Sequence, residues 1–183
     1  QIEGAHIEYI RGIRNPIGIK TGSGMTKELL LPLLDRVNPK NEEGKVTLIT
    51  RFGAHSIGKC LPPLIQAIKQ SGHQVLWTCD PMHGNTEVVG AGIKTRRFKN
   101  ILSELEQAFD IHAEGGSILG GVHLELTGEN VTECIGGARG LSEADLSRAY
   151  QSEVDPRLNG EQALELAFAI VRKRRSMRKE GSL

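Results

Sequence analysis

The sequence has 183 residues, the usual length of one domain, and its 38% hydrophobic and 25% charged residues are typical of an ordinary globular protein. Its net charge of +1 excludes a strong attraction to nucleic acid or to an anionic membrane surface, and no apolar stretch reaches the roughly 18 residues needed to span a bilayer. Three widely spaced thiols, Cys60, Cys79 and Cys134, form no disulfide framework and favour a reducing compartment. Because Gln1 replaces an initiator Met and no signal peptide follows, we expect a processed chain or part of a longer one.

The first half of the chain alternates between strand-like and helical segments. Residues 15–20 are predicted to form a short strand after a proline-containing turn. Thr26 is placed to cap a helix whose leucines recur at helical spacing. Residues 45–51 are rich in β-branched side chains and predict a second strand, which is followed by a helix over residues 56–70. This order is that of consecutive βα units.

The second half continues the alternation. Residues 74–79 predict a third strand, and apolar side chains at helical spacing predict a long helix over residues 99–113. Residues 121–126 predict a fourth strand. A short helix that opens on a serine is expected over residues 141–150, and a final helix over residues 160–175.

Alternating strands and helices of this kind indicate an α/β fold with a parallel sheet. Four strands can form a small open sheet, or half of an eight-stranded (β/α)8 TIM barrel, which needs about 250 residues. The polar residues favour the barrel, because such enzymes build their sites at the carboxyl ends of several strands. Each predicted strand ends on a chemically useful group: Lys20, Arg51, Asp80 with His83, and Glu125.

His83, Glu125 and Asp155 provide one imidazole and two carboxylates on three separate strand ends or loops. Mixed nitrogen and oxygen ligands suit Mn²⁺, Fe²⁺, Co²⁺ or Zn²⁺. Spacing alone leaves three alternatives open, namely a structural histidine, a basic neighbour for Glu125, and an Asp-Pro turn at Asp155. His123, two residues before Glu125, is interpreted as a packing residue or as the partner of a ligand.

Lys20 and Arg51 end two strands that would be neighbours in a parallel sheet. Two cations at one end of a sheet form an anion site, in which the guanidinium makes two parallel hydrogen bonds and the ammonium adds a point charge. Solvated charges at strand ends are the alternative. Lys94 and Arg96 form a candidate second basic cluster, and Thr95 between them is a candidate cap for the long helix.

Six motifs, in order along nearly the whole chain, resemble those of the type II 3-deoxy-D-arabino-heptulosonate 7-phosphate (DAHP) synthases. They are GAHIEYIRGIRNPIGIK (4–20), LITRFGAH (48–55), CDPMHGNT (79–86), KTR (94–96), ELTGENVTEC (125–134) and DPRLNGEQALELAF (155–168). The resemblance implies a (β/α)8 barrel that condenses phosphoenolpyruvate with D-erythrose 4-phosphate and releases phosphate. This is the first step of the shikimate pathway to chorismate and the aromatic amino acids.

The resemblance carries over to individual positions. His83, Glu125 and Asp155 match three of the family's four metal ligands, and the implied cofactor is a divalent metal, Mn²⁺ first and Co²⁺ as the alternative. Lys20 and Arg51 match cations that bind phosphoenolpyruvate. The catalytic residues expected from this carry-over are Lys20 and His83. Lys94 and Arg96 are expected at a second phosphate site.

Some of the family's parts have no counterpart here. The fourth metal ligand is a cysteine in an upstream motif, and none of Cys60, Cys79 or Cys134 lies in that motif. A Glu-Arg pair that also binds phosphoenolpyruvate would lie just before Gln1. We therefore expect residues 1–183 to be the C-terminal portion, roughly half, of a single catalytic barrel whose N-terminal half is missing.

The expected partners are the two substrates, with no nucleic acid and no membrane, and the full-length enzyme is expected to be a homo-oligomer. The expected location is the cytoplasm, or a plastid if a transit peptide lies upstream. Two other functions stay open. One is a different metal-dependent barrel aldolase or lyase acting on phosphorylated sugars, and the other is an inactive fragment.

Overall fold

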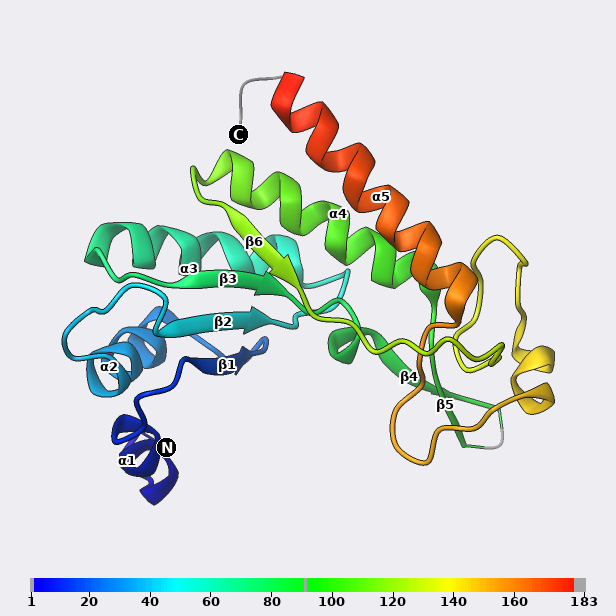
Figure 1. The fold of residues 1–183 in the computed structure, drawn as a ribbon, viewed down its shortest axis with the longest axis horizontal. Coiled ribbons are helices and arrows are strands. Elements are labelled where there is room, and N and C mark those ends of the chain that lie inside the picture. The colour runs from blue at the N-terminus through cyan, green and yellow to red at the C-terminus, as the bar shows by residue number, and fades with distance from the viewer. Residues whose placement is uncertain (1, 91, 180–183) are drawn as a thin grey trace.

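The computed structural model describes residues 2–90 and 92–179, and its main feature is a four-stranded parallel sheet (Figure 1). Neighbouring strands pair in parallel in the order β1-β2-β3-β6. These strands are β1 (Ile17–Thr21), β2 (Val46–Thr50), β3 (Leu76–Cys79) and β6 (Leu119–Val122). The α/β class and the parallel sheet are thus confirmed. The sheet is consistent with part of a (β/α) barrel and does not close on itself within the described residues.

Helices connect the strands and pack beside one another in chain order. The α-helices are α1 (Ala5–Arg11), α2 (Lys27–Val37), α3 (Ile57–Ser71), α4 (Phe98–Glu114) and α5 (Gly160–Lys179). Each helix contacts the next one, from α1 against α2 to α4 against α5. Figure 1 shows α3 and α4 running beside β3 and β6. The predicted helices after Thr26 and over residues 56–70, 99–113 and 160–175 are therefore confirmed in type and place.

The alternation of side chains along β2 separates the two faces of the sheet. Val46, Leu48 and Thr50 are buried and belong to the face that packs on the helices, whereas Thr47 and Ile49 are only half-buried. Lys20 pairs in register with Ile49 and shares this second face. The ammonium group of Lys20 therefore emerges on the face of the sheet that carries no helix.

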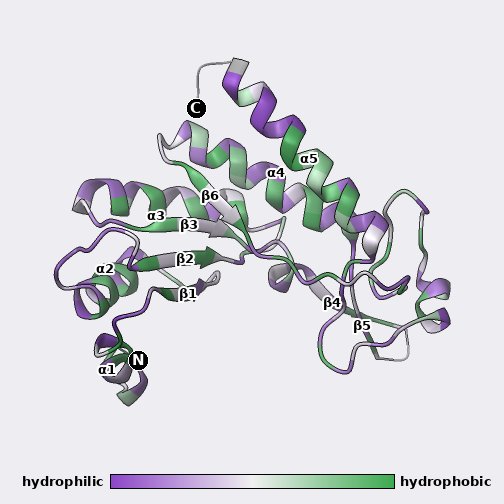
Figure 2. Cartoon of the chain, viewed as in Figure 1, coloured by the Kyte–Doolittle hydropathy of each residue, from purple (hydrophilic) through white to green (hydrophobic). Residues whose placement is uncertain are grey.

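The hydropathy colouring marks apolar residues along the strands and on parts of the helices (Figure 2), and the buried ones among them form the hydrophobic core between helices and sheet. The helices contribute Leu30, Leu34, Leu61, Leu64 and Leu105, all at most 1% exposed. Packing of these amphipathic faces, rather than intrinsic helix propensity, provides most of the helices' stability. Within residues 2–90 and 92–179, no helix combines the length and the hydropathy that crossing a membrane demands.

The fourth predicted strand has the wrong bounds. β6 ends at Val122, because β3 itself ends at Cys79 and the last backbone contact between these strands is the N–H of His123 donating to the Cys79 carbonyl at 2.8 Å. The chain then leaves β3, and Leu126 makes a single parallel bridge with Leu158. Glu125 therefore lies on an irregular segment.

Three further differences lie elsewhere in the chain. The helix predicted over residues 141–150 is a 3₁₀ helix, Glu143–Arg148, although its predicted opening is confirmed because Ser142 forms a capping box with Asp145. Helix α1 was not predicted. Nor was the antiparallel hairpin of β4 (Thr86–Val89) and β5 (Ile93–Arg96), which carries Lys94 and Arg96.

Candidate metal and anion site

The polar residues that follow β1, β2 and β3 meet at the carboxyl edge of the sheet. Register pairs Lys20 with Ile49 and Thr50 with Cys79, so Arg51 and Asp80 follow side by side. The N–H of Asp80 donates to the Thr50 carbonyl at 2.7 Å, which continues the ladder beyond the strands. His83 then begins a short 3₁₀ turn, His83–Asn85. The predicted convergence of strand ends is confirmed for these residues.

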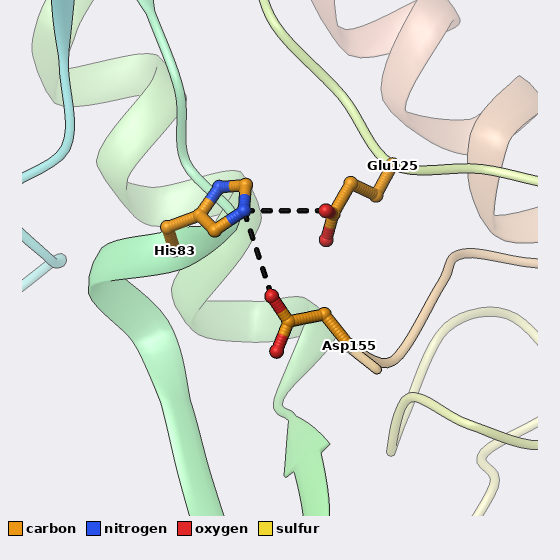
Figure 3. Close-up of side chains that lie close together, drawn as sticks. All are labelled: His83, Glu125 and Asp155. Carbon is orange, nitrogen blue, oxygen red and sulfur yellow. Dashed lines mark ion pairs between the residues drawn. The ribbon is translucent and has the colours of Figure 1, made fainter. Parts of the chain in front are cut away.

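The side chains of His83, Glu125 and Asp155 come together from three separate segments (Figure 3). The Nε2 atom of His83 lies 3.2 Å from Oε1 of Glu125 and 3.7 Å from Oδ2 of Asp155. One ligand atom from each residue lies within 4.8 Å of the others. All three side chains are partly exposed, at 24%, 29% and 24%, so the cluster is open to solvent.

Asp80 fixes the orientation of the His83 ring. Its Oδ2 atom lies 2.7 Å from Nδ1 of His83 and also accepts a hydrogen bond from Nζ of Lys20. A carboxylate only accepts hydrogen bonds, so Nδ1 donates to Asp80 and Nε2 is the ring nitrogen that faces Glu125 and Asp155. Burial acts to raise the pKa of Asp80, but the Lys20 and His83 contacts outweigh it and hold that pKa below its usual range.

Arg96 lies beneath the two carboxylates and is completely buried. Its guanidinium pairs with Oε2 of Glu125 and lies 3.8 Å from Oδ2 of Asp155. Its Nε donates a hydrogen bond to Oγ1 of Thr86 at 2.9 Å. Lys94 is half-exposed, and its Nζ lies 3.0 Å from Oδ1 of Asp155. The hydrogen bond from Lys94, together with the charges of Arg96 and Lys94, holds the pKa of Asp155 below its usual value despite some burial.

The sequence left the partner of Glu125 open, and Arg96 is that partner in the structure. Thr95 is not the cap of the long helix, because it lies within β5 and its hydroxyl donates to the Glu133 carbonyl at 2.8 Å. The helix begins at Phe98 instead. The rings of His123 and His83 lie 6.2 Å apart, which makes His123 a neighbour of the cluster.

Arg51, which is half-buried, provides one of the cations of the site. Its Nη2 donates to the backbone carbonyl of His83 at 3.0 Å, which leaves the rest of the guanidinium fork available. Among the residues that the structure describes, no carboxylate lies within ion-pair distance of Arg51. Lys20, 39% exposed, stands on the neighbouring strand. Arg51 and Lys20 thus form the cationic side of the site.

Glu104 supports this edge of the sheet from behind, and the sequence analysis did not single it out. It is fully buried on α4, and its carboxylate accepts the N–H groups of Phe52 at 2.8 Å and Gly53 at 2.9 Å, and the Asn85 amide at 2.7 Å. It therefore ties the segment after Arg51 to the turn of His83. Burial raises the pKa of Glu104 to about 7, although the three hydrogen bonds oppose the shift.

Glu133 organises the segment that carries Asp155 and was likewise not predicted. Its buried carboxylate accepts the N–H groups of Gln151 at 3.1 Å and Ser152 at 2.9 Å, and it binds both the backbone and the guanidinium of Arg157. Burial acts to raise the pKa of Glu133, but the hydrogen bonds from Arg157 and Gln151 hold it below the ordinary value. The surrounding motif, ENVTEC, is mostly polar, so nothing in it indicates that Glu133 is buried.

The cluster suits a divalent cation. Ligand atoms around one such ion, with bonds of roughly 2 Å, lie about 3–4 Å apart, and the two contacts of His83 Nε2 fall in this range. The two carboxylates repel each other, and a cation between them and Nε2 of His83 would offset that repulsion. The donor set matches metals that accept mixed nitrogen and oxygen ligands.

Fold and site together define a protein with a parallel α/β sheet that holds a His-carboxylate cluster beside two cations at the carboxyl ends of its strands. Residues 1–171 match the class-II DAHP synthetase family, and the chain belongs to that family. It is 56% identical over 182 residues to a phospho-2-dehydro-3-deoxyheptonate aldolase of Neurospora crassa, covering 98% of this chain and 38% of the relative.

A second relative has a similar span. The chain is 48% identical over 170 residues to the phospho-2-dehydro-3-deoxyheptonate aldolase AroG of Mycolicibacterium smegmatis, covering 93% of this chain and 37% of the relative. The chain therefore spans less than two fifths of the length of these curated relatives. The predicted membership of the DAHP synthase family is confirmed.

Proposed function

We propose that the protein containing this chain is a 3-deoxy-7-phosphoheptulonate synthase, a transferase that condenses phosphoenolpyruvate with D-erythrose 4-phosphate and opens the shikimate pathway. The single observation that carries this is the position of the His83, Glu125 and Asp155 cluster beside Lys20 and Arg51. Both named relatives support it, since each is called a phospho-2-dehydro-3-deoxyheptonate aldolase. We further propose that residues 1–183 are the C-terminal portion of a (β/α)8 barrel completed by upstream sequence.

His83, Glu125 and Asp155 would hold the divalent metal, for which Mn²⁺ is our first choice and Co²⁺ the alternative. A bound metal of this kind supplies Lewis-acid polarisation of a carbonyl oxygen. Asp80 keeps the His83 ring in the orientation that aims Nε2 at the two carboxylates. The resemblance to the family implies that a cysteine outside this chain is the fourth ligand.

Lys20 and Arg51 would bind the carboxylate and phosphate of phosphoenolpyruvate. The guanidinium of Arg51 is anchored at one nitrogen by the His83 carbonyl, so its remaining N–H groups are held in a fixed direction. Two fixed cations orient the enol carbon toward the aldehyde of the second substrate, which removes orientational freedom before the bond forms. Carbon–carbon bond formation, addition of water and departure of phosphate complete the reaction.

The second phosphate site at Lys94 and Arg96 stays a prediction. Arg96 is completely buried against Glu125, and Lys94 is engaged with Asp155. A phosphate at this position therefore requires Lys94 to turn away from Asp155, while Arg96 contributes through its charge. The homo-oligomeric state and the cytoplasmic or plastid location also stay predictions.

The test follows phosphate release from the protein with its natural flanking sequence, in the presence of phosphoenolpyruvate, erythrose 4-phosphate and Mn²⁺. We expect release that needs both substrates, stops with a chelator and is lost in His83→Ala. The variant His6→Ala, in an exposed position on α1, is the matched control and should retain activity. Release that needs only one substrate would favour another aldolase or lyase. No release from the folded, metal-loaded protein would reject the synthase reaction and favour another aldolase or lyase, or a non-catalytic protein.

Binding of phosphoenolpyruvate tests the anion site separately. The variant Arg51→Ala should weaken phosphoenolpyruvate by about 10–100-fold, because a charge-assisted hydrogen bond contributes roughly 1.5–3 kcal/mol. Arg172→Ala, on the exposed side of α5, removes the same charge away from the site and should leave binding unchanged. Equal affinities of the two variants would reject Arg51 as an anion ligand.

A further inference from the structure

Asp80 stands between the two halves of the proposed site and contacts both. Its Oδ2 atom accepts hydrogen bonds from Nζ of Lys20, on the anion side, and from Nδ1 of His83, on the metal side, the latter at 2.7 Å. Its Oδ1 atom accepts the N–H groups of Met82 at 3.0 Å and His83 at 3.2 Å. Both side-chain donors therefore share one oxygen, while the other oxygen fixes the backbone.

The burial of Asp80 makes its hydrogen bonds to Lys20 and His83 depend on each other. The Asp80 side chain is 0% exposed, whereas Lys20 is 39% and His83 is 24% exposed. Water can solvate the two donors when they move, whereas Asp80 has no exposed surface while both are in place. A buried carboxylate that loses a charged partner compensates by interacting more strongly with the partner that remains.

The described residues offer Asp80 no third side-chain donor. Arg51, which follows the neighbouring strand, donates to the His83 carbonyl and not to Asp80. The interaction of Asp80 with Lys20 therefore affects its interaction with His83 directly. An anion that binds Lys20 draws its ammonium toward solvent and away from Oδ2. The hydrogen bond from Nδ1 of His83 then carries more of the Asp80 charge, which makes Nε2 a stronger electron-pair donor.

We propose that Asp80 is a positioning residue that couples anion binding at Lys20 to cation binding at His83, so that each ligand tightens the other. This rests on the proposed function, because it takes Lys20 as an anion ligand and His83 as a metal ligand. Thermodynamic linkage makes the coupling reciprocal, and such couplings amount to about 5–150-fold in affinity. The coupling favours the fully loaded site over either half-loaded form.

The test measures Mn²⁺ affinity by titration calorimetry on the metal-free protein with its natural flanking sequence, with and without phosphoenolpyruvate. No second substrate is present, so the measurement is at equilibrium. We expect phosphoenolpyruvate to tighten Mn²⁺ by about 5-fold or more in the wild type. In Asp80→Asn we expect Mn²⁺ alone to weaken by about 10–100-fold, the range found when a partner of a ligating histidine is removed. The effect of phosphoenolpyruvate on Mn²⁺ affinity should fall toward 1.

A second variant keeps the proposal testable if Asp80→Asn does not fold. Lys20→Met leaves Asp80 interacting with His83 alone, so Mn²⁺ should bind more tightly than in the wild type without any anion. Arg51→Met removes a cation from the neighbouring strand that does not contact Asp80, and is the matched control for loss of charge. We expect a clearly larger tightening from Lys20→Met than from Arg51→Met.

The outcomes separate this proposal from the proposed function. If the wild type turns over both substrates and binds Mn²⁺, but folded Asp80→Asn keeps the full effect of phosphoenolpyruvate, the coupling is rejected and the function stands. Equal tightening of Mn²⁺ by Lys20→Met and Arg51→Met rejects it as well. A wild type that binds neither Mn²⁺ nor Co²⁺ overturns both proposals.

Discussion

Glu104 gives the protein a stability that depends on pH in a predictable direction. Its carboxyl group is completely buried, and burial raises its pKa from 4.5 to about 7. Between these values the folded state keeps a proton that the unfolded state has lost. Stability from this group is therefore fully present below pH 4.5 and is lost as the pH rises through 7.

The magnitude follows from the same two values. Each pKa unit corresponds to 1.36 kcal/mol, so a shift of this size reduces the free energy of unfolding by about 2–3 kcal/mol between pH 5 and pH 8. Replacing Glu104 with Gln removes the titration while it keeps an acceptor for the N–H groups of Phe52 and Gly53. It also loses the hydrogen bond from the Asn85 amide, which lowers stability equally at both pH values.

The assay is urea unfolding at pH 5 and pH 8, with a chelator present so that metal binding does not contribute. Between these pH values the stability of Glu104→Gln should rise relative to the wild type by about 2–3 kcal/mol. Glu106→Gln, exposed on the same helix, removes the same charge and should follow the wild type. A wild type and a Glu104→Gln variant that lose equal stability between the two pH values would refute the reasoning.

Three further predictions concern the segments around the site. Gly53→Ala should lower the free energy of unfolding by about 1–3 kcal/mol, because Gly53 has a φ of +84° and a Cβ there would lie 2.6 Å from the Gly84 carbonyl oxygen. Thermal unfolding measures this, and an unchanged melting temperature would contradict it. Glu133→Gln should cost about 1.5–3 kcal/mol and speed hydrogen exchange at Ser152, since it removes the charge that Arg157 and three backbone N–H groups bind; unchanged exchange there would reject the role of Glu133. Mn²⁺ at a hundred times its Kd should stabilise the protein by about 2.7 kcal/mol, and His83→Ala should abolish this shift; a shift that survives places the metal elsewhere.

The sheet and its helices could be predicted because their signals are local. β2 is a run of β-branched residues, and α4 repeats apolar residues at helical spacing, so each pattern needs no knowledge of the rest of the chain. The hairpin of β4 and β5 was missed although it carried a signal. Gly90 and Gly92 both have positive φ, a conformation that glycine adopts readily in tight turns. Two glycines flanked by β-branched residues were therefore a signal for a hairpin.

The site was predictable in part, since residue types at strand ends and motifs identified its principal members. The supporting residues were not predictable, because their roles depend on contacts across long stretches of sequence. Glu104 binds the backbone of Phe52 although five secondary-structure elements separate them in the sequence, and Arg96 reaches Glu125 from the hairpin. Nothing near Arg96 in the sequence indicates that it is buried rather than free for an anion. Spacing cannot distinguish such a residue from a solvated one.

The segment between β6 and α5, irregular apart from the 3₁₀ helix Glu143–Arg148, carries two of the three candidate ligands, Glu125 and Asp155, whereas His83 lies on a turn held by backbone hydrogen bonds to Asp80. A long segment without regular structure loses much conformational entropy when a ligand has to order it. Here Glu133 and Arg157 already order its far end. A cation that binds here therefore meets ligand side chains on a backbone that is already ordered. Less of its binding free energy is lost to ordering the chain, so its affinity is higher. Substitutions in this segment that leave every ligand intact should still weaken the cation, simply by returning freedom to the chain.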